Sequence, residues 1–230
     1  MNTLEVKHQV QQVRRYLMAQ RCFFSLKTAA DFKHMPEVPI DDRALSPRAS
    51  RKRVLEFRLG RAAAAEAMSH LIPQPVPVGK AKSGEPLWPN HIVGSITHKR
   101  YTAAAVVGAK EHIQSIGIDL EDINDHVNLR IARRFSTEKE LQWIHAVDHR
   151  PAALKLKMLF SAKESLYKTI FQWKQEPLGF KTMELTDVPG SNFFRVYLHE
   201  GAGRSGLSAD NFNVHYAFID NYIFTFVLLN

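Results

Sequence analysis

The chain shows the same order of segments twice: a long helix-forming segment, then short segments in which apolar and polar residues alternate. The first helix is predicted from Ser46, as its cap, to His70. The second is predicted from Pro151 to about Trp173, because its apolar residues recur every four positions on one face. Two such groups indicate helices packed on small sheets.

Alternation of apolar and polar residues predicts the strands. Lys99 and Arg100 form the turn of a predicted hairpin. Two short helices are predicted before the second long one, with Ser136 as the cap of the later helix and Glu140 on its exposed side. The predicted strands are 92–98, 101–107, 115–121, 193–198, 213–218 and 222–229, and the short helices are 129–135 and 137–146.

These segments predict an α+β fold made of pseudo-twofold duplicated α/β units. Each unit is expected to be a long helix packed on a small, mainly antiparallel sheet. The two halves are predicted to be residues 1–113 and 114–230, although the sequence identity between them is negligible.

The charge and composition narrow the classes of partner. The 230 residues carry a formal net charge of +8 and a pI of about 9.6, which favours polyanionic partners such as nucleic acid, acidic lipid, a polyphosphate ligand or an acidic protein. No apolar run approaches the ~20 residues of a membrane span, and no secretory signal is evident, so we expect a cytoplasmic protein. A single cysteine excludes an internal disulfide and a cysteine-rich zinc site.

Two acidic residues stand on one face of a predicted strand. In Gly117-Ile118-Asp119-Leu120-Glu121, alternation places Asp119 and Glu121 on the same face, about 7 Å apart. Two carboxylates repel each other unless a cation lies between them, and Mg²⁺ accepts such ligands. Solvated acids at the end of a strand are the alternative interpretation.

Two further segments carry polar side chains at suggestive spacings. Glu164 and Lys168 are four residues apart on one face of the second long helix, as a surface ion pair or as part of a cleft. Ser95 and Thr97 share one face of a predicted strand, and His98 follows at the turn. Hydroxyl and imidazole groups there can hold phosphate oxygens, or the histidine can be merely solvated.

In combination and in this order, these motifs resemble the 4′-phosphopantetheinyl transferase superfamily, in its monomeric two-half type. The similarity is greatest to the subgroup that serves enterobactin-like siderophore synthetases. It covers residues 45 to 175. The segments that carry it are Phe57–Arg61, Pro86–Pro89, Ser95–His98, Gly117–Glu121 and Phe160–Lys168.

The resemblance implies a site at the interface of the two halves, with the metal and catalytic residues in the second half and the coenzyme A nucleotide on the first. It implies Mg²⁺ ligands at Asp119, Glu121 and Glu164. Glu164 and Lys168 are the implied catalytic residues. Coenzyme A contacts are implied at Arg53, Arg61, Lys82, Ser95, Thr97, His98, Asp119, Lys163 and Lys168.

One departure from the family concerns the loop before Pro86. Glu85 stands where some relatives have lysine, and Lys80 or Lys82 is the candidate substitute.

The implied reaction moves the phosphopantetheine arm of coenzyme A to a serine of an apo acyl, peptidyl or aryl carrier protein. Adenosine 3′,5′-bisphosphate is released, and we expect siderophore synthesis as the pathway and a monomer as the active form. No nucleic acid is expected as a partner. The main alternative is a nucleic-acid-binding module that uses the basic segment Arg48–Arg61, and a metal-dependent nuclease is the second.

Overall fold

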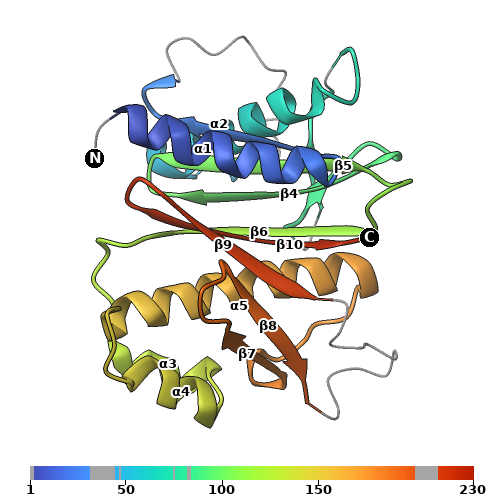
Figure 1. Cartoon of the computed structure of the whole chain (residues 1–230). Coiled ribbons are helices and arrows are strands. Elements are labelled where there is room, and N and C mark those ends of the chain that lie inside the picture. Colours follow the sequence, from blue (N-terminus) through green and yellow to red (C-terminus); the bar gives the residue numbers. More distant parts are fainter. Residues whose placement is uncertain (1–2, 32–44, 47, 75, 82–83, 200–211) are drawn as a thin grey trace. The chain divides into compact units, whose positions relative to one another are not determined.

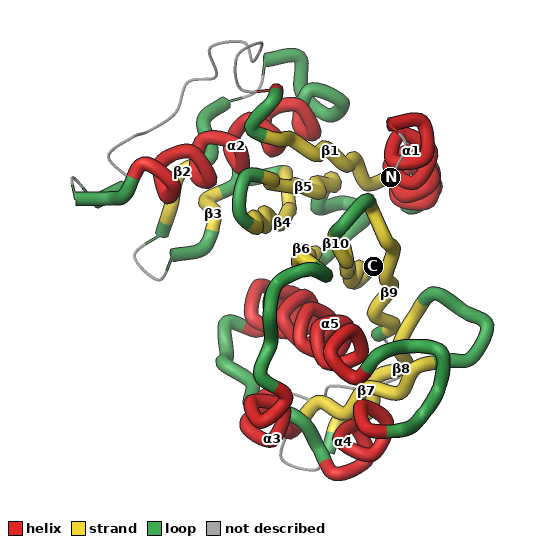
Figure 2. Tube along the Cα trace, turned by 90° about the vertical axis from the view of Figure 1, so that its left-hand side faces the viewer, coloured by secondary structure: helices red, strands yellow, loops and turns green. Residues whose placement is uncertain are grey.

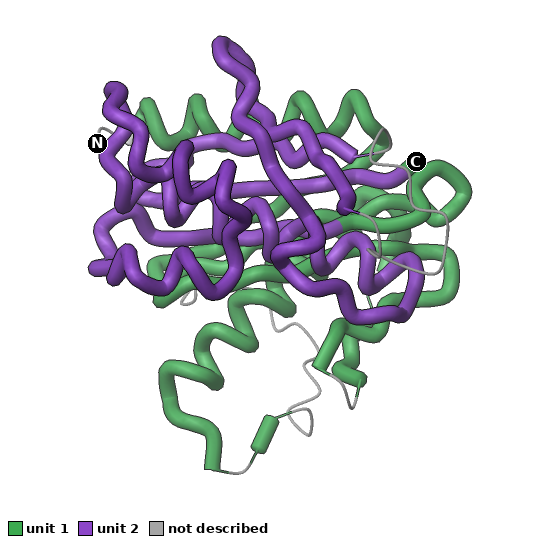
Figure 3. Tube along the Cα trace, turned by 90° about the horizontal axis from the view of Figure 1, so that it is seen from below, with its two compact units in different colours: residues 1–116, 230 green, residues 117–229 purple. Residues whose placement is uncertain are grey.

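The computed structural model describes residues 3–31, 45–46, 48–74, 76–81, 84–199 and 212–230. It divides the chain into two compact units, residues 1–116 with Asn230 and residues 117–229, which Figure 3 distinguishes by colour. Each unit combines helices with an antiparallel sheet, so the predicted α+β class is confirmed. In the described part of the chain, no helix has both the length and the hydropathy that a membrane span requires.

In the N-terminal unit, one long helix covers a three-stranded antiparallel sheet. The strand order is β1-β5-β4, and α2 packs against all three strands, as Figure 2 shows. Buried alanines of α2 allow the helix to approach the sheet closely. The elements are α1 (Thr3–Ala19), β1 (Cys22–Thr28), α2 (Arg51–Met68), β2 (Gly79–Lys80), β3 (Pro86–Leu87), β4 (Ile92–Lys99) and β5 (Thr102–Ala109).

In the C-terminal unit, the helix α5 packs against a five-stranded sheet of order β6-β10-β9-β8-β7 (Figure 1). The predicted long helix and the four strands expected from residue 115 onward are all present. The elements are β6 (Ser115–Asp122), η3 (Leu129–Ile131), α3 (Ala132–Phe135), α4 (Glu138–His145), α5 (Ala152–Lys174), η4 (Phe180–Thr182), β7 (Met183–Asp187), β8 (Phe193–Leu198), β9 (Asn213–Ile219) and β10 (Tyr222–Leu229).

Two predicted helix starts are wrong. Helix α2 begins after Ser50, whose hydroxyl accepts a hydrogen bond from the Arg53 amide, whereas Ser46 caps only a turn. Helix α4 is capped by Thr137, not Ser136, because Thr137 and Glu140 form a reciprocal capping box. Glu140 is therefore buried rather than exposed.

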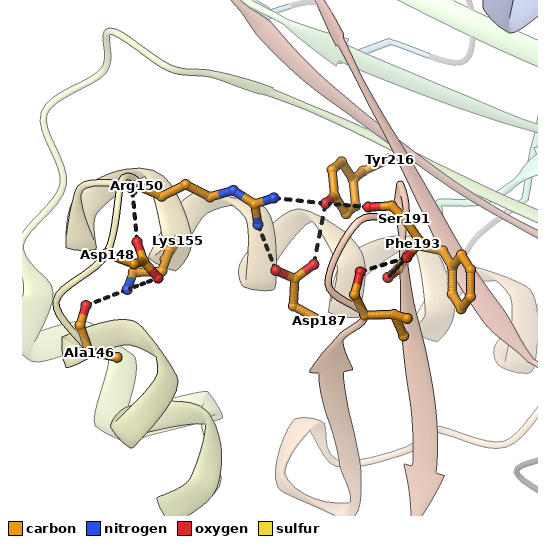
Figure 4. Close-up of polar contacts among 9 residues, drawn as sticks. Ala146, Asp148, Arg150, Lys155, Asp187, Ser191, Phe193 and Tyr216 are labelled. Carbon is orange, nitrogen blue, oxygen red and sulfur yellow. Dashed lines mark hydrogen bonds and ion pairs between the residues drawn. The ribbon is translucent and has the colours of Figure 1, made fainter.

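A polar network fixes the loop that precedes α5 (Figure 4). The guanidinium of Arg150 donates hydrogen bonds to Asp187 of β7, at 2.6 Å, and to the hydroxyl of Tyr216 of β9, at 3.2 Å. The fully buried ammonium of Lys155 donates to the Ala146 carbonyl, at 2.6 Å, and to Asp148, at 3.1 Å. These contacts anchor the N-terminal end of α5 to its neighbours, and thereby help to place the residues farther along that helix.

Candidate functional site

Strand β6 lies against α5 at Gly117. An added Cβ at Gly117 would meet the Ser165 carbonyl oxygen at 1.9 Å and Thr169 Oγ1 at 2.3 Å, so only glycine permits this approach. Because side chains alternate along a strand, Asp119 and Glu121 share the face of Gly117 that turns toward α5. Asp119 is 7% exposed, and Glu121 is half-buried.

Glu164 of α5 lies within electrostatic range of the strand acids. Burial raises the pKa of its carboxyl, the ammonium of Lys168 opposes this rise, and the negative charges of Asp119 and Glu121 add to it. A carboxylate influences a second carboxyl in this way only when the two are close in space. The three acids that the sequence suggested therefore act on one another electrostatically.

Lys168 joins this acidic group from the next turn of α5. Its ammonium donates one hydrogen bond to Asp119 Oδ1, at 2.8 Å, and another to the Ile118 carbonyl oxygen, at 2.9 Å. The side chain of Lys168 is 31% exposed and that of Asp119 is 10% exposed, so the ion pair lies at the edge of the solvent. This pair links α5 directly to β6.

The donor set has the chemistry that a magnesium ion requires, because carboxylate and carbonyl oxygens are hard ligands. The side chains are not yet arranged around a common point. Among the residues that the structure describes, no three His, Cys, Asp or Glu side chains stand in a geometry that could hold a metal ion. Asp119 instead holds the ammonium of Lys168.

Lys163 is not part of this acidic group, although the sequence placed it with the coenzyme A contacts. Its side chain is fully buried and donates to Glu140 Oε2, at 2.7 Å, and to the carbonyls of Phe135 and Phe180, at 2.9 and 2.8 Å. These partners occupy the three protons of the ammonium. These contacts favour an internal role for Lys163, and its contact with coenzyme A stays a prediction.

In the N-terminal unit, His98 lies on the face of the sheet that α2 covers. Its Nε2 is 2.7 Å from Arg53 Nη1, and its Nδ1 is 3.6 Å from Glu56 Oε2. His98 belongs to β4, as the predicted strand 92–98 has it, but β4 continues through Lys99, so the turn comes one residue later than predicted. Alternation places the buried Ser95 and Thr97 on the opposite face, and the three side chains therefore do not form one group.

Arg61, an implied coenzyme A contact, is 7% exposed and anchors a loop. Its Nε and Nη2 donate to the carbonyls of Val78 and Gly79, at 2.7 and 3.0 Å. Burial and the neighbouring Arg53 lower the pKa of Arg61 to about 10. This geometry supports an internal role for Arg61. Lys82 lies outside the described residues.

Comparison with known sequences accounts for most of the chain. Residues 41–108 match the 4′-phosphopantetheinyl transferase N-terminal domain, and residues 115–227 match the 4′-phosphopantetheinyl transferase superfamily. The transferase Svp of Streptomyces mobaraensis is 31% identical over 73% of this chain and 70% of its own length. The chain belongs to the 4′-phosphopantetheinyl transferase superfamily.

Other members of the superfamily are similar over shorter regions. The 4′-phosphopantetheinyl transferase Npt of Nocardia iowensis is 36% identical over 59% of this chain. Enterobactin synthase component D of Salmonella typhimurium is 36% identical over 67% of this chain. The matched regions span 60% and 63% of the lengths of these two relatives.

The two superfamily regions divide the candidate residues. Asp119, Glu121, Glu164 and Lys168 lie within residues 115–227, which match the superfamily. Arg53 and His98 lie within residues 41–108, which match its N-terminal domain.

Sequence reasoning missed Glu56, the acidic neighbour of His98. Glu56 follows Arg53 by three residues, in a segment that was interpreted only as basic. This spacing places both residues on one face of the helix and could have identified Glu56.

Proposed function

We propose that this member of the superfamily transfers the 4′-phosphopantetheine group of coenzyme A to a serine hydroxyl of an apo carrier protein, with Mg²⁺ as cofactor. The grouping of Asp119, Glu121 and Glu164 beside Lys168, within the region matched to the superfamily, carries this proposal. A basic protein is also a suitable host for coenzyme A, which carries a pyrophosphate and a 3′-phosphate.

In the proposed reaction, the serine Oγ attacks the phosphorus on the pantetheine side of the pyrophosphate. The bond from that phosphorus to the bridging oxygen breaks, and adenosine 3′,5′-bisphosphate leaves. Glu164 takes the serine proton, directly or through water. Lys168 offers its ammonium to the departing phosphate.

Asp119, Glu121 and Glu164 would hold the magnesium ion, whose charge neutralises the pyrophosphate oxygens when it is bound. In the N-terminal unit, Arg53 is an exposed cation beside His98 and stays a candidate for the nucleotide phosphates. For Ser95 and Thr97, contact with the nucleotide remains a prediction.

We propose a carrier of siderophore synthesis as the first partner to test. Relatives named enterobactin synthase component D support this choice, at 36% identity in one of them. The Nocardia transferase Npt is equally identical over its matched region, so carriers of other pathways belong in the same experiment.

Mass spectrometry of apo carriers tests the proposal directly. Each carrier is incubated with the full chain, coenzyme A and Mg²⁺, and the expected product is heavier by one phosphopantetheine group. The variant Asp119→Asn keeps the size of the side chain but removes its charge, and it should lose transfer by at least about a hundredfold. Glu138→Gln, at an exposed position of α4, is the matched control and should transfer at the normal rate.

The nucleic-acid alternative predicts the opposite result. It requires tight binding to duplex DNA with a steep dependence on salt, and no consumption of coenzyme A. Part of the basic helix is already engaged within the protein, since Lys52 faces Glu56, at 3.8 Å, and Arg61 donates to backbone carbonyls. Arg61 is therefore engaged within the protein rather than offered to a DNA phosphate.

A further inference from the structure

The ammonium of Lys168 occupies oxygen donors on two successive residues of β6. One is a carboxylate oxygen of Asp119, at 2.8 Å, and the other is the carbonyl oxygen of Ile118, at 2.9 Å. A divalent ion of the magnesium type selects the same kind of hard oxygen ligand. The lysine therefore competes for donor atoms that the proposed cofactor would also use.

The charged residues around Glu164 show what the ammonium of Lys168 does in this group. Asp119 and Glu121 raise the pKa of Glu164 through repulsion, and Lys168 lowers it through attraction. Of the three charged residues that act on the Glu164 carboxyl, Lys168 carries the positive charge. It partly offsets the mutual repulsion of three carboxylates, which is also what a bound divalent cation would do.

The two cations repel each other at Asp119. An ammonium and a divalent ion on the same carboxylate would stand within a few ångströms, where like charges repel strongly in a partly buried site. We propose that Lys168 is an internal counter-ion that competes with the divalent cation for Asp119, so that binding of the cation releases the ammonium from β6. This inference rests on the proposed function, because it concerns the cofactor of the same site.

Lys168 has the freedom that such an exchange requires. Its side chain is 31% exposed, so the ammonium can leave Asp119 for solvent or for a ligand phosphate without being buried unpaired. Lys163, five residues earlier on the same helix, is the contrasting case, because its fully buried ammonium is fixed by three acceptors. Release of Lys168 would couple loading of the cation to presentation of a free ammonium.

Binding of Mn²⁺ to the full chain without coenzyme A tests the exchange, with calorimetry or electron paramagnetic resonance as the readout. Lys168→Met removes the competing charge and should tighten Mn²⁺ binding by about tenfold. Lys168→Ala should do the same and guards against obstruction by the methionine side chain. Lys168→Arg keeps the competitor and should bind no more tightly than the unmodified chain.

Lys174→Met is the matched control, because it removes the same charge from the same helix at a residue that lies over the Trp173 ring. It should leave Mn²⁺ affinity unchanged. Circular dichroism of each variant in EDTA verifies that the fold is retained. Equal Mn²⁺ affinity in Lys168→Met, Lys168→Ala and Lys174→Met would overturn the inference, and so would the absence of Mn²⁺ binding in every chain.

The transfer assay separates this inference from the proposed function. Transfer by the unmodified chain, together with equal Mn²⁺ affinity of all variants, overturns the counter-ion role alone. Tighter Mn²⁺ binding by Lys168→Met, together with no transfer to any carrier, upholds the counter-ion role and overturns the proposed reaction. Where both hold, Lys168→Met should need less Mg²⁺ for half-maximal rate while its kcat falls.

Discussion

At the scale of single residues, Gly117 sets the distance between the strand acids and Glu164. Gly117→Ala places a methyl group 1.9 Å from the Ser165 carbonyl oxygen, so β6 has to move away from α5. We expect a loss of about 3 kcal/mol in unfolding free energy and a large loss of transfer. Urea unfolding and the transfer rate measure the two effects.

Gly179→Ala is the control for that substitution, because its nearest side-chain atom would be 3.9 Å away, on Thr182. Its stability and activity should stay close to those of the unmodified chain. Equal behaviour of the two alanine variants would show that the close approach at Gly117 does not matter.

The residue scale also shows where sequence reasoning succeeds and where it fails. Alternation along a strand and the four-residue spacing of a helix grouped Asp119 with Glu121, and Glu164 with Lys168, because both rules follow from backbone geometry. They could not place Lys163, whose partner Glu140 belongs to another helix. A buried ion pair between distant segments leaves no local periodicity.

At the scale of elements, α5 is tied to its surroundings by buried lysines. Besides Lys155 and Lys163, Lys157 donates to the carbonyls of Ile123 and Asp125, just after β6. Each lysine therefore fixes a different segment against one helix. The sequence predicted α5 correctly from its apolar spacing, but an apolar pattern does not reveal that charged residues on the same helix are buried.

Breaking one of these ties tests their importance. Lys163→Met leaves the buried carboxylate of Glu140 without its counter-ion, and we expect a loss of about 3–5 kcal/mol in unfolding free energy. Adding Glu140→Gln removes the uncompensated charge, so the double variant should be more stable than Lys163→Met alone. Lys181→Met, at an exposed position, is the control and should change stability little.

Urea denaturation of the unmodified chain, Lys163→Met, Glu140→Gln and the double variant gives the coupling energy between Lys163 and Glu140. Additive effects of the two substitutions would contradict a direct interaction and return Lys163 to the candidates for ligand contact.

Element boundaries were the weakest part of the prediction at this scale. Thr137 and Glu140 have the spacing of a capping box, so the sequence contained the signal that identifies Thr137 as the cap of α4. Strands β1 and β7 were not predicted. Strand β1 pairs with β5, which follows far along the chain, so a local pattern does not show its partner. Strand β7 pairs with the next strand, β8, but its five residues are too few for a clear alternation.

At the scale of the whole molecule, the order of segments was enough to predict the α+β class, because helices and alternating strands bury their apolar faces in few ways. It was not enough to predict strand order. In the C-terminal unit, β6 neighbours β10, the last strand of the chain, and this pairing joins segments separated by most of the unit. The partner of β6 depends on the assembled core rather than on its own residues.

Net charge is the property of the whole molecule that bears on the proposed partner. A chain of charge +8 attracts an acidic carrier protein over a distance that salt shortens. Raising NaCl from roughly 50 mM to 500 mM should therefore lower kcat/KM for the carrier by about tenfold, while kcat at saturating substrates changes little.

A carrier whose surface acids are replaced by glutamine controls for effects of salt on coenzyme A, because its kcat/KM should depend on salt less steeply. If kcat/KM depended on salt equally for both carriers, salt would be acting on coenzyme A binding. Long-range attraction would then not contribute to carrier docking.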